Sequence, residues 1–172
     1  MTDTAAPHAS IARDRADVRR DLVVVGATPG GIATALRGAR EGLTVLLTER
    51  ASHVGGMLTG GLCVMDTQYD QSRAAIYNEI CERVLNHYRS QYGADSVQYQ
   101  HVQPRNKWPL TAEPHVLQQV LTEMVATEKN VTVATGWWPT AVIRSGRLLR
   151  QVEFGEELLD TRQTQHLVTA RV

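Results

Sequence analysis

A glycine-rich break after a short apolar run constrains this chain more than any other feature. Leu22–Val25 is apolar and β-branched without alternation, a pattern typical of a strand buried on both faces. The next six residues, 26–31, read Gly-Ala-Thr-Pro-Gly-Gly and turn the chain sharply. Apolar residues then follow at the spacing of one helix face and end near Gly42: Ile32, Ala35, Leu36 and Ala39. With residues 44–47 as a second buried strand, the segment predicts a βαβ unit with parallel strands and a right-handed crossover.

The rest of the chain adds helices and a hairpin to this unit. The expected elements are two helices, a strand and the two arms of a hairpin, at residues 77–88, 114–125, 131–135, 139–143 and 148–154. Pro114 suits the first turn of its helix, and Ser145-Gly146 suits the hairpin turn. Residues 91–108 are polar and aromatic without a clear period, so an irregular segment is expected there. The predicted fold class is α/β, with a parallel sheet, extra helices and a β-hairpin.

The composition describes one globular domain without a strongly charged surface. The chain has 172 residues, enough to bury a core, and its 18 basic side chains balance 18 acidic ones. This balance gives no electrostatic basis for binding nucleic acid or an anionic membrane. Cys63 and Cys81 stand far apart, outside any CxxC or Cys/His ligand spacing. Neither a disulfide framework nor a metal site is therefore expected.

The N-terminal region is expected to lie outside the core. Residues 1–20 mix both charges with small polar side chains, which predicts a mobile tail before a domain of residues 21–172. Arg19-Arg20 precedes the first apolar run and superficially resembles an export signal. That run, Leu22–Val25, is shorter than the roughly 7–15 apolar residues of a signal sequence. We therefore expect a strand at this place and a cytoplasmic protein.

The turn at residues 26–31 has the composition of a phosphate-binding turn. A diphosphate at a helix N-terminus meets unpaired N–H groups and the positive end of the helix dipole. Gly26 permits the tight turn, Gly30 adds freedom, and Gly31 lets the helix pack onto the strand. The usual fingerprint is G-x-G-x-x-G, and Thr28 replaces its middle glycine. The threonine would crowd a diphosphate or add a donor to it. A tight strand-to-helix connection without a ligand explains the same residues.

Glu49 strengthens the nucleotide hypothesis. It lies 23 residues after Gly26, at the end of the second strand, where an acidic side chain can accept hydrogen bonds from both ribose hydroxyls of an adenosine. An acidic residue at this place disfavours a 2′-phosphate, so NADP is a poor candidate. The alternative is a solvated surface glutamate.

A second glycine cluster follows a few residues later, at Gly55-Gly56-Met57-Leu58-Thr59-Gly60-Gly61. A plain NAD-binding domain does not need it, whereas a flavin nucleotide extends past the first strand and needs bare backbone beside it. Together, the segments DLVVVGATPGGIA, LTVLLTER and HVGGMLTGGL resemble the opening of FAD-dependent oxidoreductases of the glutathione-reductase-like superfamily. The resemblance covers roughly residues 20–155. It implies a Rossmann-type FAD/NAD(P)-binding fold.

The resemblance also implies a cofactor, FAD, and a reaction, hydride transfer between FAD and an unknown small molecule. The residues that would hold the diphosphate are Gly26, Thr28, Gly30 and Gly31. Glu49 would hold the ribose, with Arg50 beside it, and the path towards the isoalloxazine would be lined by Gly55, Gly56, Met57, Leu58 and Thr59. The adenine would meet the main chain near Pro139 or Thr140.

Other residues have a plainer explanation. Cys63 suits a buried structural thiol better than a redox thiol, since no second cysteine stands in CxxC spacing. His53 suits a solvent-facing loop, His115 local structure, and Trp137-Trp138 packing rather than a stacking platform. No residue can be assigned as a catalytic acid or base.

Relatives of this kind close the flavin site with later segments, including a strand resembling IDATG. The chain is therefore expected to be the N-terminal part of such an enzyme, to bind FAD weakly or not at all by itself, and to have an oligomeric state that the sequence does not define. Two alternatives stay open. One is a non-catalytic fragment or nucleotide-binding remnant. The other is a small NAD-binding module, which the second glycine cluster disfavours.

Overall fold

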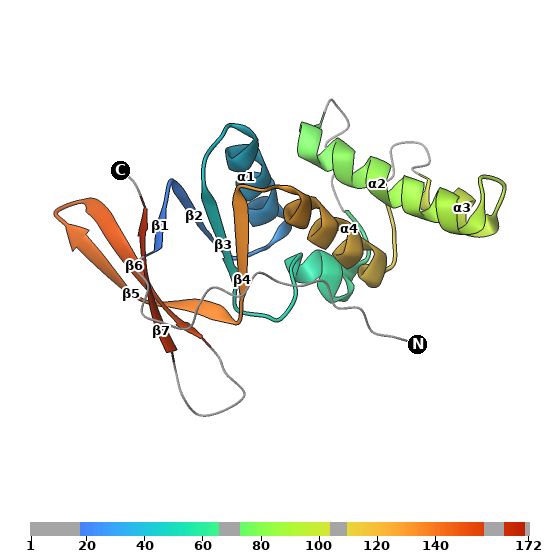
Figure 1. Ribbon diagram of the computed structural model, residues 1–172. Helices are drawn as coiled ribbons and strands as arrows, with labels where there is room; N and C mark the ends of the chain where they lie inside the picture. Colours follow the sequence, from blue (N-terminus) through green and yellow to red (C-terminus); the bar gives the residue numbers. More distant parts are fainter. Residues whose placement is uncertain (1–17, 66–72, 104–109, 157–163, 171–172) are drawn as a thin grey trace.

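The computed structural model describes residues 18–65, 73–103, 110–156 and 164–170 (Figure 1). Its elements are β1 (Val18–Arg20), β2 (Leu22–Val25), α1 (Pro29–Arg40), β3 (Val45–Glu49), η1 (Leu58–Leu62), α2 (Ala75–Tyr92), α3 (Val97–Val102), α4 (Pro114–Thr127), β4 (Val131–Thr135), β5 (Trp137–Ser145), β6 (Leu148–Glu156) and β7 (Thr164–Ala170). These elements form three layers. Helices cover one face of the parallel sheet β2-β3-β4, and the sheet β1-β7-β6-β5 covers the other (Figure 1).

The βαβ unit predicted from the sequence is confirmed. β2 and β3 pair in parallel with Leu22 opposite Val45, and α1 joins them. β3 then pairs in parallel with β4, and Glu49 stands opposite Thr135 at the end of both strands. Val45, Leu46 and Leu47 are fully buried, because β3 is the central strand. β2 is less buried than predicted, because its second edge has no strand partner among the residues described.

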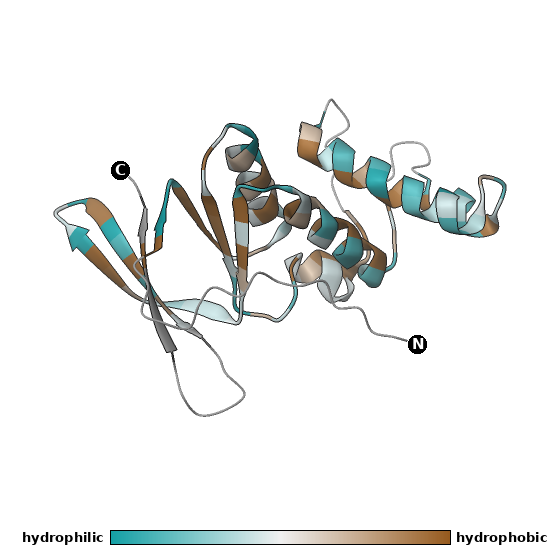
Figure 2. Cartoon of the chain, in the orientation of Figure 1, coloured by the Kyte–Doolittle hydropathy of each residue, from teal (hydrophilic) through white to brown (hydrophobic). Residues whose placement is uncertain are grey.

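Alternate residues of β3 face two different cores. Val45 and Leu47 belong to the core beneath the helices, whereas Leu46 belongs to a smaller core with Trp137 and Phe154. This alternation is what a strand between two apolar layers requires. Figure 2 shows brown residues along the parallel strands and mixed faces on α2 and α4, as expected for buried strands and half-exposed helices.

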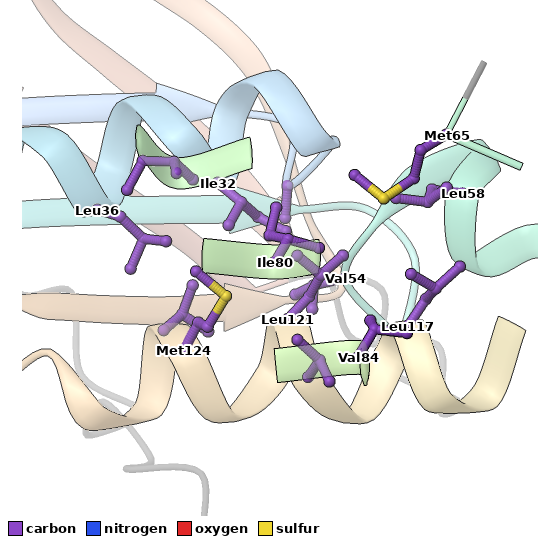
Figure 3. Close-up of a cluster of buried hydrophobic side chains, with 14 of the residues drawn as sticks. Ile32, Leu36, Val54, Leu58, Met65, Ile80, Val84, Leu117, Leu121 and Met124 are labelled. Carbon is purple, nitrogen blue, oxygen red and sulfur yellow. The ribbon is translucent and has the colours of Figure 1, made fainter. Parts of the chain in front are cut away.

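The larger core joins α1, α2 and α4 to the loop after β3. Figure 3 shows its side chains meeting from these segments: Ile32, Leu36, Val54, Leu58, Met65, Ile80, Val84, Leu117, Leu121 and Met124. An ion-pair network covers one edge of this core. Arg40 of α1 bridges Glu79 of α2 at 2.7 Å and Glu128, after α4, at 2.6 Å. The three helices therefore hold one another beneath the parallel sheet.

Two predictions made from the sequence need correction: the extent of the N-terminal tail and the irregular segment after α2. The predicted hairpin is confirmed. Val18–Arg20, expected within the mobile tail, form β1 and pair in parallel with β7, a partner about 150 positions away that no local pattern could indicate. Residues 1–17 lie outside the described part. The expected irregular stretch contains α3, six residues capped by the Ser96 hydroxyl, too short to show a period. The hairpin is confirmed as β5–β6, which turns at Gly146 with φ +61°.

Candidate functional site

The turn after β2 has no room for a side chain at Gly31. A Cβ built there would lie 2.0 Å from the carbonyl oxygen of Gly26. Gly26 itself has φ +95°, a conformation that favours glycine, and its N–H donates to the Thr48 carbonyl of β3 at 2.8 Å. A Cβ at Gly26 or Gly30 would have no neighbour closer than 4.0 Å. Gly31 therefore allows α1 to pack closely against the turn, whereas Gly26 and Gly30 leave the outer surface of the turn without side chains.

Thr28 is the N-cap of α1. Its Oγ1 accepts the N–H of Gly31 at 3.2 Å, and its carbonyl accepts the N–H of Ile32 at 2.8 Å. Pro29 follows as the first helical residue and has no N–H to leave unpaired. The first turn of this 12-residue helix contains no acidic side chain. The positive end of the helix dipole is therefore available to an anion.

Glu49 ends β3 and binds the backbone of two loops. One carboxylate oxygen accepts the N–H of Ala27 at 2.8 Å, and the other accepts the N–H of Ala51 at 3.0 Å. The side chain therefore fixes the turn after β2 against the loop after β3. Arg50 points elsewhere: its guanidinium lies over the ring of Trp138, 5.7 Å from the ring centre. That contact with β5 was not apparent from the sequence, because the tryptophan is 88 positions away.

The second glycine cluster lies directly beside the first. The N–H of Gly55 donates to the carbonyl of Ala27 at 2.7 Å. A Cβ at Gly56 would touch the Thr28 methyl group at 3.4 Å. Gly55 and Gly56 have φ +107° and +54°, so both adopt backbone conformations that favour glycine. The structure therefore joins the two glycine segments that the sequence separates by about 25 residues.

The remaining residues of this cluster have different surroundings. Met57 is 78% exposed, whereas Leu58 and Thr59 are buried. The Thr59 hydroxyl donates to the Val54 carbonyl at 2.7 Å, and its side chain fills the space that a Cβ at Gly55 would need. Leu58 and Thr59 thus offer only their backbone to a ligand, while Met57 offers its side chain.

The weaker candidates are distributed around this centre. Cys63 is half-buried with φ +63°, and burial raises the pKa of the separate Cys81 thiol. His115 is exposed, and His53 lines a cavity of about 390 Å³ between the loop after β3, β4 and α4. Trp137 packs against Phe154 with ring centres 5.9 Å apart, as the packing interpretation predicts.

The residues expected to meet the adenine lie in β5, a few positions past the end of β4. Pro139 and Thr140 lie inside β5, where Pro139 stands opposite Phe154 of β6. The main chain beside the end of β3 is instead Thr135-Gly136, because Glu49 pairs with Thr135. The sequence could not fix this register, since Gly136 with φ +78° bends the chain between β4 and β5.

Within the described ranges, no group of three or more His, Cys, Asp or Glu side chains could hold a metal ion. None of the helices described is both long and apolar enough to cross a membrane.

A parallel sheet with a glycine turn into a helix, and an acidic residue at the end of the next strand, defines a Rossmann-type FAD/NAD(P)-binding fold. Residues 21–169 match the family model described as FAD dependent oxidoreductase. This chain belongs to that family. It therefore holds an FAD-binding part of a flavin-dependent oxidoreductase, and FAD is its cofactor. Among curated protein sequences, none matches the chain.

Solved structures share the fold at low sequence identity. THI4 of Thermovibrio ammonificans is 16% identical, with a TM-score of 0.53 over 88% of this chain and 53% of that one. The anhydrotetracycline hydroxylase OxyS of Streptomyces rimosus is 15% identical, with a TM-score of 0.54 over 89% and 30%. A 3-ketosteroid-delta4-(5alpha)-dehydrogenase of Rhodococcus jostii RHA1 is 15% identical, with a TM-score of 0.53 over 90% and 44%. The chain thus spans about half or less of each of these proteins.

Proposed function

We propose that the two joined glycine segments hold the diphosphate of FAD, and that the bound flavin exchanges a hydride with a small-molecule substrate. The observation that carries the proposal is the hydrogen bond between Gly55 and Ala27, which places bare backbone from both segments at one point. A diphosphate needs such bare backbone, because its oxygens must approach N–H groups closely. The cytoplasm is the proposed location, supported by the apolar run after Arg19-Arg20 being strand β2.

The donors at this point fit an anion. Neither the N–H of Thr28 nor that of Gly30 donates to another described residue, and no Cβ at Gly26 or Gly30 shields them. The helix dipole of α1 adds positive potential at the same place. Gly26, Thr28, Gly30 and Gly31 are therefore assigned to the diphosphate, with the backbone of Gly55 and Gly56 on the other side.

Glu49 is assigned to the ribose. Each of its oxygens already accepts one backbone N–H. A carboxylate has about four lone-pair sites, so two are left for ribose hydroxyls. The backbone contacts also hold the side chain in one place, which reduces the entropy that binding costs. Arg50 with Trp138, and the main chain at Gly136, are assigned to the adenine side.

The flavin, when bound, supplies the hydride chemistry. The residues of this chain would bind and orient it. Met57, exposed beside the glycine segments, would cover part of the cofactor between them and the solvent. Leu58 and Thr59 would fix the loop from below through their buried side chains.

Equilibrium dialysis tests the proposal. The 172-residue chain is dialysed against FAD and, separately, against NAD, and the bound nucleotide is measured by absorbance. We expect retention of FAD at concentrations where NAD is not retained, because only FAD extends along the second glycine segment. Tighter retention of NAD would overturn the proposal in favour of a small NAD-binding module.

A further inference from the structure

The start of α1 has fewer free backbone donors than its sequence position suggests. The first helical residue, Pro29, has no N–H. The N–H of the third, Gly31, already donates to Thr28 Oγ1. Among the first three residues of α1, only Gly30 therefore has an N–H that no described residue accepts. In a G-x-G-x-x-G turn the residue at position 28 is glycine, and no side chain competes for that third N–H.

The two branches of the Thr28 side chain point to different partners. Its methyl group faces Gly56, where a Cβ would lie at 3.4 Å, and its hydroxyl oxygen faces the N–H of Gly31. A threonine hydroxyl has one proton to donate and two lone pairs to accept with. The oxygen uses a lone pair for Gly31, and no described residue accepts its proton. The N–H of Gly31 is therefore not available to a ligand, whereas the hydroxyl proton of Thr28 is.

We propose that the hydroxyl of Thr28 is the donor offered to a diphosphate oxygen in place of the N–H of Gly31. Thr28 then replaces the middle glycine without loss of a hydrogen bond to the diphosphate. Its hydroxyl group donates in place of the backbone N–H of Gly31, which the hydroxyl oxygen accepts. The methyl group lies on the side of Gly56, so the hydroxyl is directed towards the N–H of Gly31. The inference rests on the proposed function, since it assumes that the diphosphate lies at this turn.

The hydroxyl would bind the diphosphate and not the adenosine. Its loss should therefore weaken ADP, which has a diphosphate, and leave adenosine unaffected, which provides the test. Affinities of ADP and of adenosine are measured by displacement of FAD from the 172-residue chain. The variants are Thr28→Val, which keeps the shape without a donor, Thr28→Ser, which keeps the hydroxyl, and Thr28→Gly, which frees the N–H of Gly31. Each variant is first compared with the wild type by circular dichroism.

We expect Thr28→Val to weaken ADP and FAD at least about tenfold, with adenosine unchanged, because a hydrogen bond to a charged acceptor is lost. The methyl group that takes the place of the hydroxyl covers the N–H of Gly31, so this N–H cannot act as the donor, as it can in Thr28→Gly. Thr28→Ser and Thr28→Gly should each stay within a few-fold of the wild type. Equal loss of ADP and adenosine in Thr28→Val would show that the residue only caps the helix, and would overturn the inference. Unchanged ADP affinity in Thr28→Val would also overturn it. Failure of the wild type to bind FAD or ADP would instead overturn the proposed function.

Discussion

One carboxylate oxygen of Glu49 lies 2.8 Å from the backbone nitrogen of Ala27 and accepts its hydrogen bond. The other oxygen accepts the N–H of Ala51 at 3.0 Å. Glu49 ends β3, whereas Ala27 lies in the turn after β2, so one side chain ties together the loops at the ends of two neighbouring strands. The residue proposed for the ribose therefore also shapes the turn that is proposed for the diphosphate.

Replacement of Glu49 by alanine is therefore expected to reduce both stability and FAD affinity. Loss of the acceptor leaves two backbone N–H groups unpaired, and the free energy of unfolding should fall by about 1.5–3 kcal/mol. Glu49→Gln keeps one acceptor oxygen and should lose less. Urea denaturation measures the first effect, and equilibrium dialysis with FAD the second. An unfolding midpoint equal to that of the wild type would show that the two backbone contacts contribute nothing.

Gly30 and Gly31 are neighbours with opposite steric surroundings, and they form a matched pair. In Gly31→Ala the new methyl group meets the Gly26 carbonyl at 2.0 Å, so α1 must move from β2. Overpacking of this kind costs about 1–3 kcal/mol, and flavin binding should be lost with it. In Gly30→Ala the methyl group has open space, and Ala favours the helix by about 1 kcal/mol. We expect Gly30→Ala to fold as well as the wild type in thermal denaturation, yet to bind FAD more weakly. Full FAD affinity in Gly31→Ala would refute the geometry of the turn.

The parts of the site that lie in one stretch of sequence were predictable. The spacing of glycines and apolar residues along the chain predicts the glycine turn, the helix after it and the second strand, and the structure confirms all three. Glycine also indicates where backbone must come close or adopt positive φ, as at Gly26, Gly31 and Gly55. Such constraints act on single residues, so a single sequence reveals them.

The parts that depend on partners far along the chain were not predictable. β1 exists because β7 pairs with it, and Arg50 is directed by Trp138. The hydrogen bond that Glu49 accepts from Ala27 depends on the position of a backbone N–H 22 residues away. The position of β5 relative to the end of β3 depends on the bend at Gly136. In each case tertiary contact, and not local propensity, determines the outcome.

The ion pairs around Arg40 predict a pH dependence of stability. The Arg40 guanidinium hydrogen-bonded to Glu79 lowers the pKa of that carboxyl from its ordinary value of 4.5, burial opposes this, and Arg83 adds to the lowering. A lowered folded-state pKa gives stability that is present above pH 4.5 and lost as the pH falls through the folded-state value. Glu79→Gln should cost about 1 kcal/mol near neutral pH, and the difference from the wild type should shrink on acidification.

Urea denaturation as a function of pH measures this difference. The exposed pair Arg37–Glu41 provides the control, since both side chains are more than half exposed and Glu41→Gln should change little at any pH. A difference between the wild type and Glu79→Gln that grows at low pH would contradict the direction of the shift.

The start of α4 depends on a hydroxyl from another helix. Glu113 is the N-cap of α4, but its side chain makes no capping hydrogen bond. Its N–H donates instead to the hydroxyl oxygen of Tyr88 in α2 at 3.1 Å, and Tyr88 is only 3% exposed. Tyr88→Phe keeps the ring in the core and removes the acceptor, so the free energy of unfolding should fall by about 1–2 kcal/mol.

Tyr92→Phe, with Tyr92 47% exposed one turn later in α2, is the control and should change the midpoint of urea denaturation little. Because α4 packs beside η1 and the second glycine cluster, Tyr88→Phe should also speed amide hydrogen exchange at Leu117 and Leu121 relative to the Tyr92→Phe protein. Equal exchange rates and equal midpoints in the two variants would show that Tyr88 contributes only its ring.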